Sequence, residues 1–346
     1  MTRRSSRRDI LAFAAAGLVW GRFTEALAGV LDRRRIAFLI GNEGSGGYEA
    51  YARLFAKHLA LALPQSRMTV EVVQTADGRL AAKQIFEAPA GDLTIGLFEA
   101  ALLYAEILDE EDVKFNLGAF NWLGKLAVDE RVVVASKLSG INSIADLANR
   151  SEPAVYPAST SASRASFECY VLNDILGLSI KPVPGYNGGQ RALAMISGEG
   201  QIVVGSYGSV RRLVEEEGAA VILRMNAVPN PGAPVSAPLL RDIAPKPVSK
   251  LADLMELSGN LGRWIAAPPN ADAADVDALR TAFDAAVHDE AFLAEAAQLK
   301  IPIDPLSGSE VQGLVGALLA DKAALQADLQ AAIACGRRRA VGDRTC

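Results

Sequence analysis

The sequence is poor in the residues that carry most metal and nucleophile chemistry. It has only 2 histidines, His58 and His288, and 3 scattered cysteines without metal-ligand spacing. Each histidine lies in a long helical pattern beside a charged neighbour, so we expect both on solvated helix faces. The sequence therefore predicts no metal site, and a Ser–His catalytic pair would have to use one of these two residues.

Signatures of common enzymes and of nucleic-acid binding are also missing. There is no G-x-x-x-x-G-K-[ST] or G-x-S-x-G motif, and the run Gly44–Glu49 ends in glutamate where G-x-G-x-x-G needs glycine. No tyrosine is followed four residues later by lysine. Lysine and arginine number 35 against 40 aspartates and glutamates, a formal net charge of -5, which argues against a nucleic-acid partner. We expect no cofactor and no catalytic residues.

Long hydrophobic runs are absent as well. The longest candidate, Ile10–Trp20, is shorter than the ~20 residues that span a bilayer. It follows several arginines and precedes Ala26-Leu27-Ala28, a small-x-small site, so residues 1–28 are predicted to be an export signal cleaved after Ala28. Ser6–Leu11 resembles a twin-arginine signal, and an ordinary secretory signal is the alternative. We expect the mature chain to be exported and soluble.

The remainder of the chain alternates between short apolar runs and segments of helical spacing. With 346 residues, 50% of them hydrophobic, it predicts about two domains of α/β class with mainly parallel sheets. Strands are expected at Ile36–Ile40, Met68–Val73, Leu93–Leu97, Arg131–Ala135, Ala154–Tyr156, Ile180–Val183, Ile202–Val204, Val221–Met225 and Arg263–Ala267. Helices are expected at Tyr48–Leu63, Leu80–Glu87, after Ser143, and at Ser163–Leu176, Gln190–Ser197 and Tyr207–Glu217.

The last third of the chain has a different organisation. Asn226–Pro247 is rich in proline and glycine and predicts an extended crossover, and helices are expected throughout Ala271–Ala334. The basic tail, residues 335–346, is expected to fray from Gly336 onward. In an oxidising compartment Cys335 and Cys346 could pair and leave Cys169 free, and three unpaired thiols are the alternative.

Three strand-to-helix turns are rich in Gly, Ser or Thr: Gly41–Tyr48, Pro157–Arg164 and Gly185–Gln190. The first amides of a helix have no partner and carry partial positive charge, and small residues let an anion approach them. In open α/β sheets, ligands bind beyond the carboxyl ends of the strands. Three such turns at one cleft predict a site for a small carboxylate, whereas any single turn would be explained by helix capping.

Arg164 is the one full cation in these turns. It could form a bidentate pair with a carboxylate, or lie exposed at a helix start. Tyr48, Tyr186 and Asn187 could bond to ligand oxygens, although Tyr48 could equally be the first apolar residue of its helix. Without the leader, which carries +3, the chain has a charge of -8 and cannot attract an anion by its overall field. The dipoles at the turns are therefore expected to supply the affinity.

At these turns the sequence resembles the solute-binding receptors of tripartite tricarboxylate transporters, the Bug-type proteins. Gly46–Arg53 is similar to the family's entry into its first helix, and Gly185–Gly189 resembles its Gly-Tyr-x-Gly-Gly turn. Further similarity lies at Phe120–Gly124, Ile144–Leu147 and Ile303–Gly308. The likeness covers most of residues 35–320, and the order and spacing of the motifs are more specific than any one of them.

The resemblance implies the type II periplasmic binding protein fold, with two α/β lobes around a ligand cleft. Lobe 1 is expected to comprise residues 29–130 and 236–334, and lobe 2 residues 131–235, with crossings near Asp129–Arg131 and Asn226–Ala237. It implies a monomeric periplasmic receptor that closes on a small carboxylate and delivers it to the membrane permease subunits of the transporter. The ligand-binding residues carried over by motif, with Arg164 beside them, are Ser45, Gly46, Gly47, Tyr48, Ser159, Thr160, Ser161, Arg164, Tyr186, Asn187, Gly188 and Gly189.

Other functions remain open at this point. A binding protein of another transporter class or a periplasmic sensor would have the same fold, and the neighbouring genes would distinguish them. An exported α/β enzyme that binds a phosphate or nucleotide at Gly41–Tyr48 would need His58 or His288 for turnover. Glu49 stands near the family's aspartate and would repel an anion if its side chain pointed into the cleft.

Overall fold

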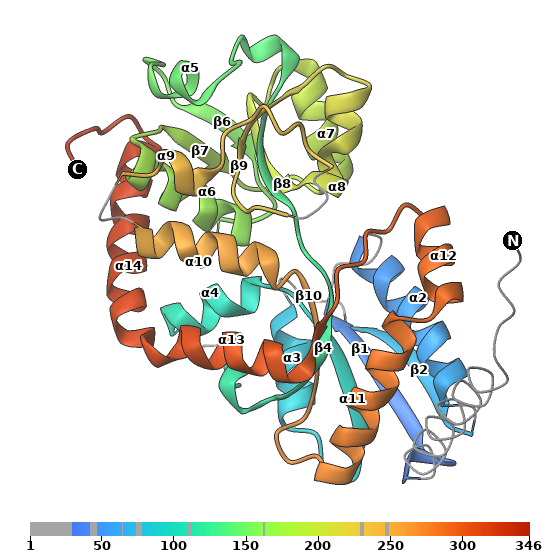
Figure 1. Ribbon diagram of the computed structural model, residues 1–346. Helices are drawn as coiled ribbons and strands as arrows, with labels where there is room; N and C mark the ends of the chain where they lie inside the picture. Colours follow the sequence, from blue (N-terminus) through green and yellow to red (C-terminus); the bar gives the residue numbers. More distant parts are fainter. Residues whose placement is uncertain are drawn as a thin grey trace, which may run out of the picture.

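The chain folds into two α/β lobes, drawn one above the other in Figure 1. The computed structural model describes residues 30–41, 47–63, 65–73, 78–109, 113–161, 163–228, 232–245 and 249–346. The predicted export signal and its cleavage site lie outside these residues. Within them, no helix combines the length and the apolar character that crossing a bilayer requires.

A six-stranded mixed sheet forms the first lobe, in the order β11-β4-β10-β3-β1-β2. Its strands are β1 (Arg35–Gly41), β2 (Arg67–Val73), β3 (Leu93–Phe98), β4 (Asn121–Ala127), β10 (Arg263–Ala267) and β11 (Leu306–Ser307). β1 pairs in parallel with β2 and β3, whereas β10 runs antiparallel to β3 and β4. Because β10 lies between β3 and β4, the sheet is assembled from segments far apart in the sequence (Figure 1).

Helices cover both faces of this sheet, because alternate strand residues point to opposite sides. On one face Phe38 and Ile95 share an apolar core with α2, α11 and α12. On the other face Trp122 and Trp264 stack with centroids 4.2 Å apart and pack with α3, α4 and α13. These helices are α2 (Gly47–Ala62), α3 (Arg79–Phe86), α4 (Ala101–Leu108), α11 (Ala273–Val287), α12 (Glu290–Gln298) and α13 (Gly308–Ala320).

The second lobe contains two smaller sheets. β5 (Arg131–Ala135) lies between β8 (Ile202–Ser206) and β9 (Ala220–Arg224) and is antiparallel to both, while β6 (Ala154–Pro157) and β7 (Ile180–Val183) are parallel. The expectation of mainly parallel sheets is therefore wrong for β8-β5-β9. β5 enters directly from the first lobe, so no βαβ crossover fixes its direction. The helices here are α5 (Ile144–Ala148), α6 (Arg164–Leu176), α7 (Gly188–Ser197) and α8 (Tyr207–Glu215).

Two neighbouring connections join the lobes. Residues 128–130 carry the chain from β4 to β5, and α10 (Ser249–Asn260) leads back into β10. The buried Asn226 side chain accepts a hydrogen bond from the Arg131 amide (2.8 Å) and donates one to Asn260 (3.1 Å). Gly262 permits the close approach, since a Cβ there would lie 2.4 Å from the Asp129 nitrogen. The two connections are thus bonded to each other.

The proline-rich segment after β9 doubles back on the second lobe. The Arg224 amide donates to the Pro238 carbonyl (2.9 Å), and the Gly232 amide donates to the Glu130 carboxylate (2.9 Å). This segment includes the short helix α9 (Leu240–Ile243). Its described part, residues 232–245, therefore stays beside β9 before α10 begins.

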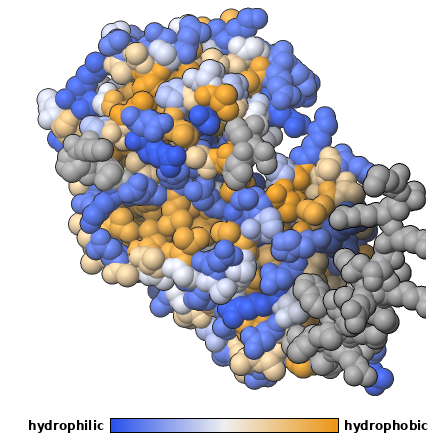
Figure 2. Space-filling model, viewed as in Figure 1, coloured by the Kyte–Doolittle hydropathy of each residue, from blue (hydrophilic) through white to orange (hydrophobic). Residues whose placement is uncertain are grey.

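The last helix, α14 (Lys322–Arg339), lies along the second lobe. From the sequence, residues up to 334 were expected in lobe 1. Leu325 and Leu329 share a core with the second-lobe strands, and a Cβ on Gly336 would lie 2.0 Å from the Tyr170 carbonyl oxygen of α6. Apolar side chains gather over α4 and α13 beside this junction (Figure 2). A continuous apolar core therefore extends between the lobes through α4, α10 and α14.

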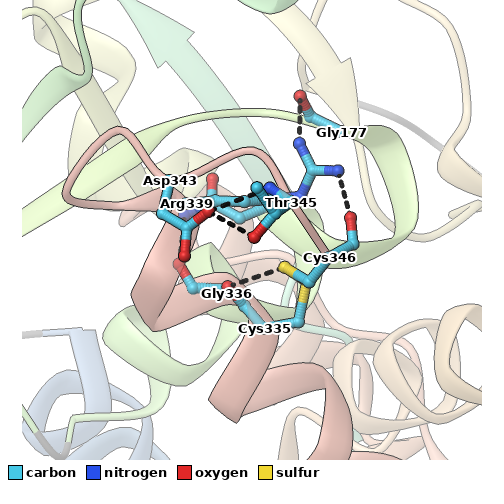
Figure 3. Close-up of a disulfide and its surroundings, with 8 residues drawn as sticks. Gly177, Cys335, Gly336, Arg339, Asp343, Thr345 and Cys346 are labelled. Carbon is cyan, nitrogen blue, oxygen red and sulfur yellow. Dashed lines mark hydrogen bonds between the residues drawn. A yellow bond between two sulfur atoms is a disulfide. The ribbon is translucent and has the colours of Figure 1, made fainter.

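The tail is held in place by a disulfide between Cys335 and Cys346, whose Cα atoms are 5.7 Å apart (Figure 3). Arg339 donates to the Cys346 carbonyl (2.7 Å) and Cys169 is a free, buried cysteine. Of the two alternatives for the cysteines, the structure has the pairing. The expected fraying from Gly336 is wrong, because residues 335–339 continue α14 and the disulfide fixes the residues after it.

His58 does not lie on a solvated helix face. Its side chain is 5% exposed, its Nε2 lies 2.8 Å from the Glu295 carboxylate, and its ring packs edge-on against Phe292 of α12. The charged neighbour Lys57 faces solvent while His58 turns beneath α12, which sequence spacing alone did not show. His288, at the end of α11, is exposed as expected.

Candidate functional site

A cleft of about 860 Å³ lies between the lobes. The first lobe contributes Tyr48, Glu99 and Arg263, and the connection from β4 to β5 contributes Asp129 and Arg131. The second lobe contributes most of the remaining polar side chains and exposed backbone, namely Tyr156, Ser159, Ser163, Arg164, Asn187, Gly188, Gly189, Arg191, Ser206 and Ser209. Both lobes and one connection therefore meet at this cleft.

Three helices of the second lobe begin at the cleft. Ser163 caps α6 by accepting from the Ser166 amide (3.3 Å), and Asn187 caps α7 by accepting from the Gln190 amide (3.0 Å) in a complete capping box. α8 begins after Ser206. In the part of the chain that the structure describes, the Gly188 and Gly189 amides have no acceptor, so they remain available to an anion.

A buried ion network forms the floor of the cleft. Arg164 donates to Glu168 through Nε (2.9 Å) and to Asp129 through Nη1 (3.0 Å). Arg131 contacts both oxygens of Glu168, and Arg263 lies 3.5 Å from the other Asp129 oxygen. The network joins the first lobe, the connection and α6, so it links the two lobes at the base of the cleft.

The charge state of Asp129 follows from this network. Burial alone would raise the pKa of Asp129, but Arg263, Arg131 and Arg164 together outweigh burial and hold that pKa well below its usual range. The carboxylate therefore stays ionised and neutralises part of the arginine charge. A ligand anion would not meet three unbalanced guanidinium groups.

Tyr48 lies at the cleft but its polar atom is already used. Its hydroxyl donates to the Gly262 carbonyl (3.1 Å), and the Arg263 guanidinium carbon sits 4.1 Å from its ring centroid. Burial raises the pKa of Tyr48, and it raises that of Tyr51 to about 12. Tyr48 therefore supports Arg263 by a cation–π contact. The adjacent Glu49 bonds to Arg53 (2.7 Å) within α2.

The structure brings six of the predicted ligand-binding residues to the cleft: Tyr48, Ser159, Arg164, Asn187, Gly188 and Gly189. Thr160 and Ser161 are exposed and are not among the cleft residues. Tyr186 bonds to Glu199 and faces a separate hollow along α7. Ser45 and Gly46 lie outside the described residues, and Gly47 is the first residue of α2.

Arg164 is occupied by neighbouring protein groups. Besides Asp129 and Glu168, it donates through Nη2 to the Ser258 hydroxyl (3.0 Å), and the residue is 9% exposed. The exposed alternative for Arg164 is thus wrong. Its three bonded nitrogens show that it braces α6 against the connection between the lobes.

Sequence reasoning missed the other cationic residues of the cleft, Arg131, Arg191 and Arg263. Arg131 and Arg263 are each the first residue of a strand, and both are buried. A charged residue is rarely buried unless it has a partner of opposite charge. An arginine at the start of a predicted strand was the signal in the sequence, but most of the carboxylates that pair with these arginines lie far away in the sequence. The positive groups that line the cleft therefore include these arginines as well as the helix N-termini.

Two α/β lobes joined by paired connections around a polar cleft define a bilobal binding-protein architecture. BugD, a periplasmic binding protein, is 15% identical with a TM-score of 0.67, over 86% of this chain and 98% of that chain. MatC from Rhodopseudomonas palustris with bound malate is 16% identical with a TM-score of 0.65, over 84% and 99%. R. palustris Rpa4515 with adipate is 15% identical with a TM-score of 0.65, over 86% and 97%.

No family model and no curated protein matches the chain. The similarity to solved structures therefore establishes the fold. The chain has the α/β periplasmic binding protein fold of the TctC and Bug structures, as the sequence predicted. Within the described residues, no cluster of His, Cys, Asp and Glu side chains is arranged to hold a metal ion.

Proposed function

We propose that this protein is a periplasmic solute-binding receptor of the TctC and Bug type, which binds a small carboxylate between its lobes. The observation that carries the proposal is the convergence of helix N-termini and arginines on one cleft. The free amides of Gly188 and Gly189 and the guanidinium of Arg191 line the cleft from the second lobe, and Arg263 lines it from the first. A carboxylate bound there would contact both lobes and favour their closure.

The fold neighbours support this ligand class. MatC carries malate and Rpa4515 carries adipate, both small dicarboxylates. The proposed cycle makes and breaks no covalent bond, and neither histidine is among the residues that line the cleft. We propose further that the receptor works as a monomer, is exported with removal of residues 1–28, and passes its ligand to a membrane permease.

A thermal-shift screen of mono-, di- and tricarboxylates against the mature protein tests the ligand class. A receptor of this class is stabilised by roughly 2.7 kcal/mol when the ligand is present at 100 times its Kd. No stabilisation by any member of the panel would overturn the proposal. Uptake of the stabilising carboxylate by cells with and without the gene then tests delivery to a permease.

A further inference from the structure

Arg191 differs from the other arginines of the cleft in its charge balance. Arg131, Arg164 and Arg263 share the carboxylates of Asp129 and Glu168, and the charge of Glu99 also acts on Arg263. In that group three guanidinium charges face three carboxylates. Among the described residues, Arg191 has no carboxylate partner.

Arg191 is nevertheless held in a fixed position. Its Nε donates to the Pro157 carbonyl at the end of β6 (3.0 Å), and its guanidinium carbon lies 5.8 Å from the ring centroid of Tyr156. Its two terminal nitrogens have no acceptor in the described part of the chain. An arginine fixed through Nε presents those two nitrogens as a fork, the geometry that binds a carboxylate with two parallel hydrogen bonds.

The position of Arg191 in α7 also calls for an anion. It is the fourth residue of the helix, in the first turn, where the helix dipole disfavours a cation. The same turn exposes the Gly188 and Gly189 amides to the cleft. A carboxylate placed beside this turn would accept from the amides and from the fork together, and it would neutralise the charge of Arg191.

We propose that Arg191 is the specificity-determining residue of the cleft, and that it anchors a carboxylate group of the ligand on the second lobe. This inference rests on the proposed function. A ligand that has an amide in place of that carboxylate would keep its shape but lose the charge that Arg191 complements. Arg191 therefore sets the preference for an acid over the corresponding amide.

The test is calorimetric titration of wild-type protein, Arg191→Gln, Arg191→Lys and the control Arg212→Gln, whose side chain is 81% exposed at the surface. The probes are adipate, malate and butyrate, each paired with its amide, together with circular dichroism to confirm folding. Arg191→Gln is expected to weaken carboxylate binding at least about tenfold and amide binding much less. Arg191→Lys keeps the charge without the fork, so it should lose less, and Arg212→Gln should match wild type.

The outcomes are distinguishable. If wild type binds a carboxylate and Arg191→Gln binds it equally well, the role of Arg191 is wrong while the proposed function stands. Equal losses for acid and amide would mean that Arg191 acts only through folding, which also overturns the inference. If wild type binds none of the carboxylates, both the proposed function and the inference fail. Should Arg191→Gln not fold, the acid-to-amide ratio of Arg191→Lys decides, with an unchanged ratio against the inference.

Discussion

Replacing Glu168 with glutamine perturbs the ion network that joins the lobes. Glu168 is fully buried on α6, where Arg131 contacts both of its oxygens and Arg164 donates to it at 2.9 Å. Glutamine keeps the length of the side chain and one acceptor oxygen, but removes the negative charge. The Asp129 carboxylate and the charge of Glu99 then face three arginines.

The expected cost follows from the burial of these charges. Removing one partner of a buried ion pair costs about 3–5 kcal/mol, because the remaining charge stays out of water without compensation. The acceptor oxygen that glutamine retains places the expected loss at the lower end, about 3 kcal/mol. At about 2–4 °C per kcal/mol for chains of this order of size, the Tm should fall by roughly 6–12 °C.

Urea unfolding and thermal melts followed by circular dichroism measure this loss. The matched control is Glu215→Gln on α8, whose side chain is 57% exposed and pairs with Arg211 at 3.7 Å. Exposed pairs of this kind contribute little, so the control should stay within about 0.5 kcal/mol of wild type. If Glu168→Gln loses no more stability than the control, the network does not hold the lobes together.

Three further predictions concern Gly188 at the start of α7, Gly336 in α14, and the effect of pH on stability. Gly188→Pro removes one cleft amide at a helix position that tolerates proline, so calorimetry should show carboxylate binding weakened about 10–100-fold with folding intact. Gly336→Ala would place a methyl group 2.0 Å from the Tyr170 carbonyl oxygen and should lower the Tm, whereas Gly316→Ala on α13, where a Cβ meets open space, should not. Folding lowers the pKa of Asp129, so the ionised carboxylate stabilises the folded state above the ordinary pKa of 3.8, and this stabilisation is lost as the pH falls below that value. The free energies of unfolding of wild type and Asp129→Asn, measured in urea, should therefore differ most above about pH 4 and converge at lower pH.

The sequence predicted best where short-range signals decide the structure. β5, β7 and β10 begin and end as expected. After their first arginine, β5 and β10 are compact buried apolar runs. The start of α6 after Ser163 and the turn before α7 were also readable, since Ser163 and Asn187 are strong N-cap residues. The turn at Gly188 and Gly189 was accordingly expected at the cleft, which both residues line.

The sequence predicted poorly where distant segments meet. α4 was missed because residues 101–107 are buried on every side, so it lacks the amphipathic period that marks a surface helix. Arg131 and Arg263 are 132 positions apart in the sequence, yet both lie beside the Asp129 carboxylate, and no local sequence pattern predicts this. The packing of α14 on α6 depends on the close approach at Gly336, which is equally non-local.

Hydrogen exchange with and without the carboxylate that binds tests the interlobe site most directly. We expect added protection on both lobes, in residues 47–51 and near Arg263 on one side and in residues 163–166 and 187–191 on the other. Closure around the ligand requires protection at both sets of residues, because each lobe supplies part of the cleft. Protection confined to one lobe, or to residues outside the cleft, would contradict ligand capture between the lobes.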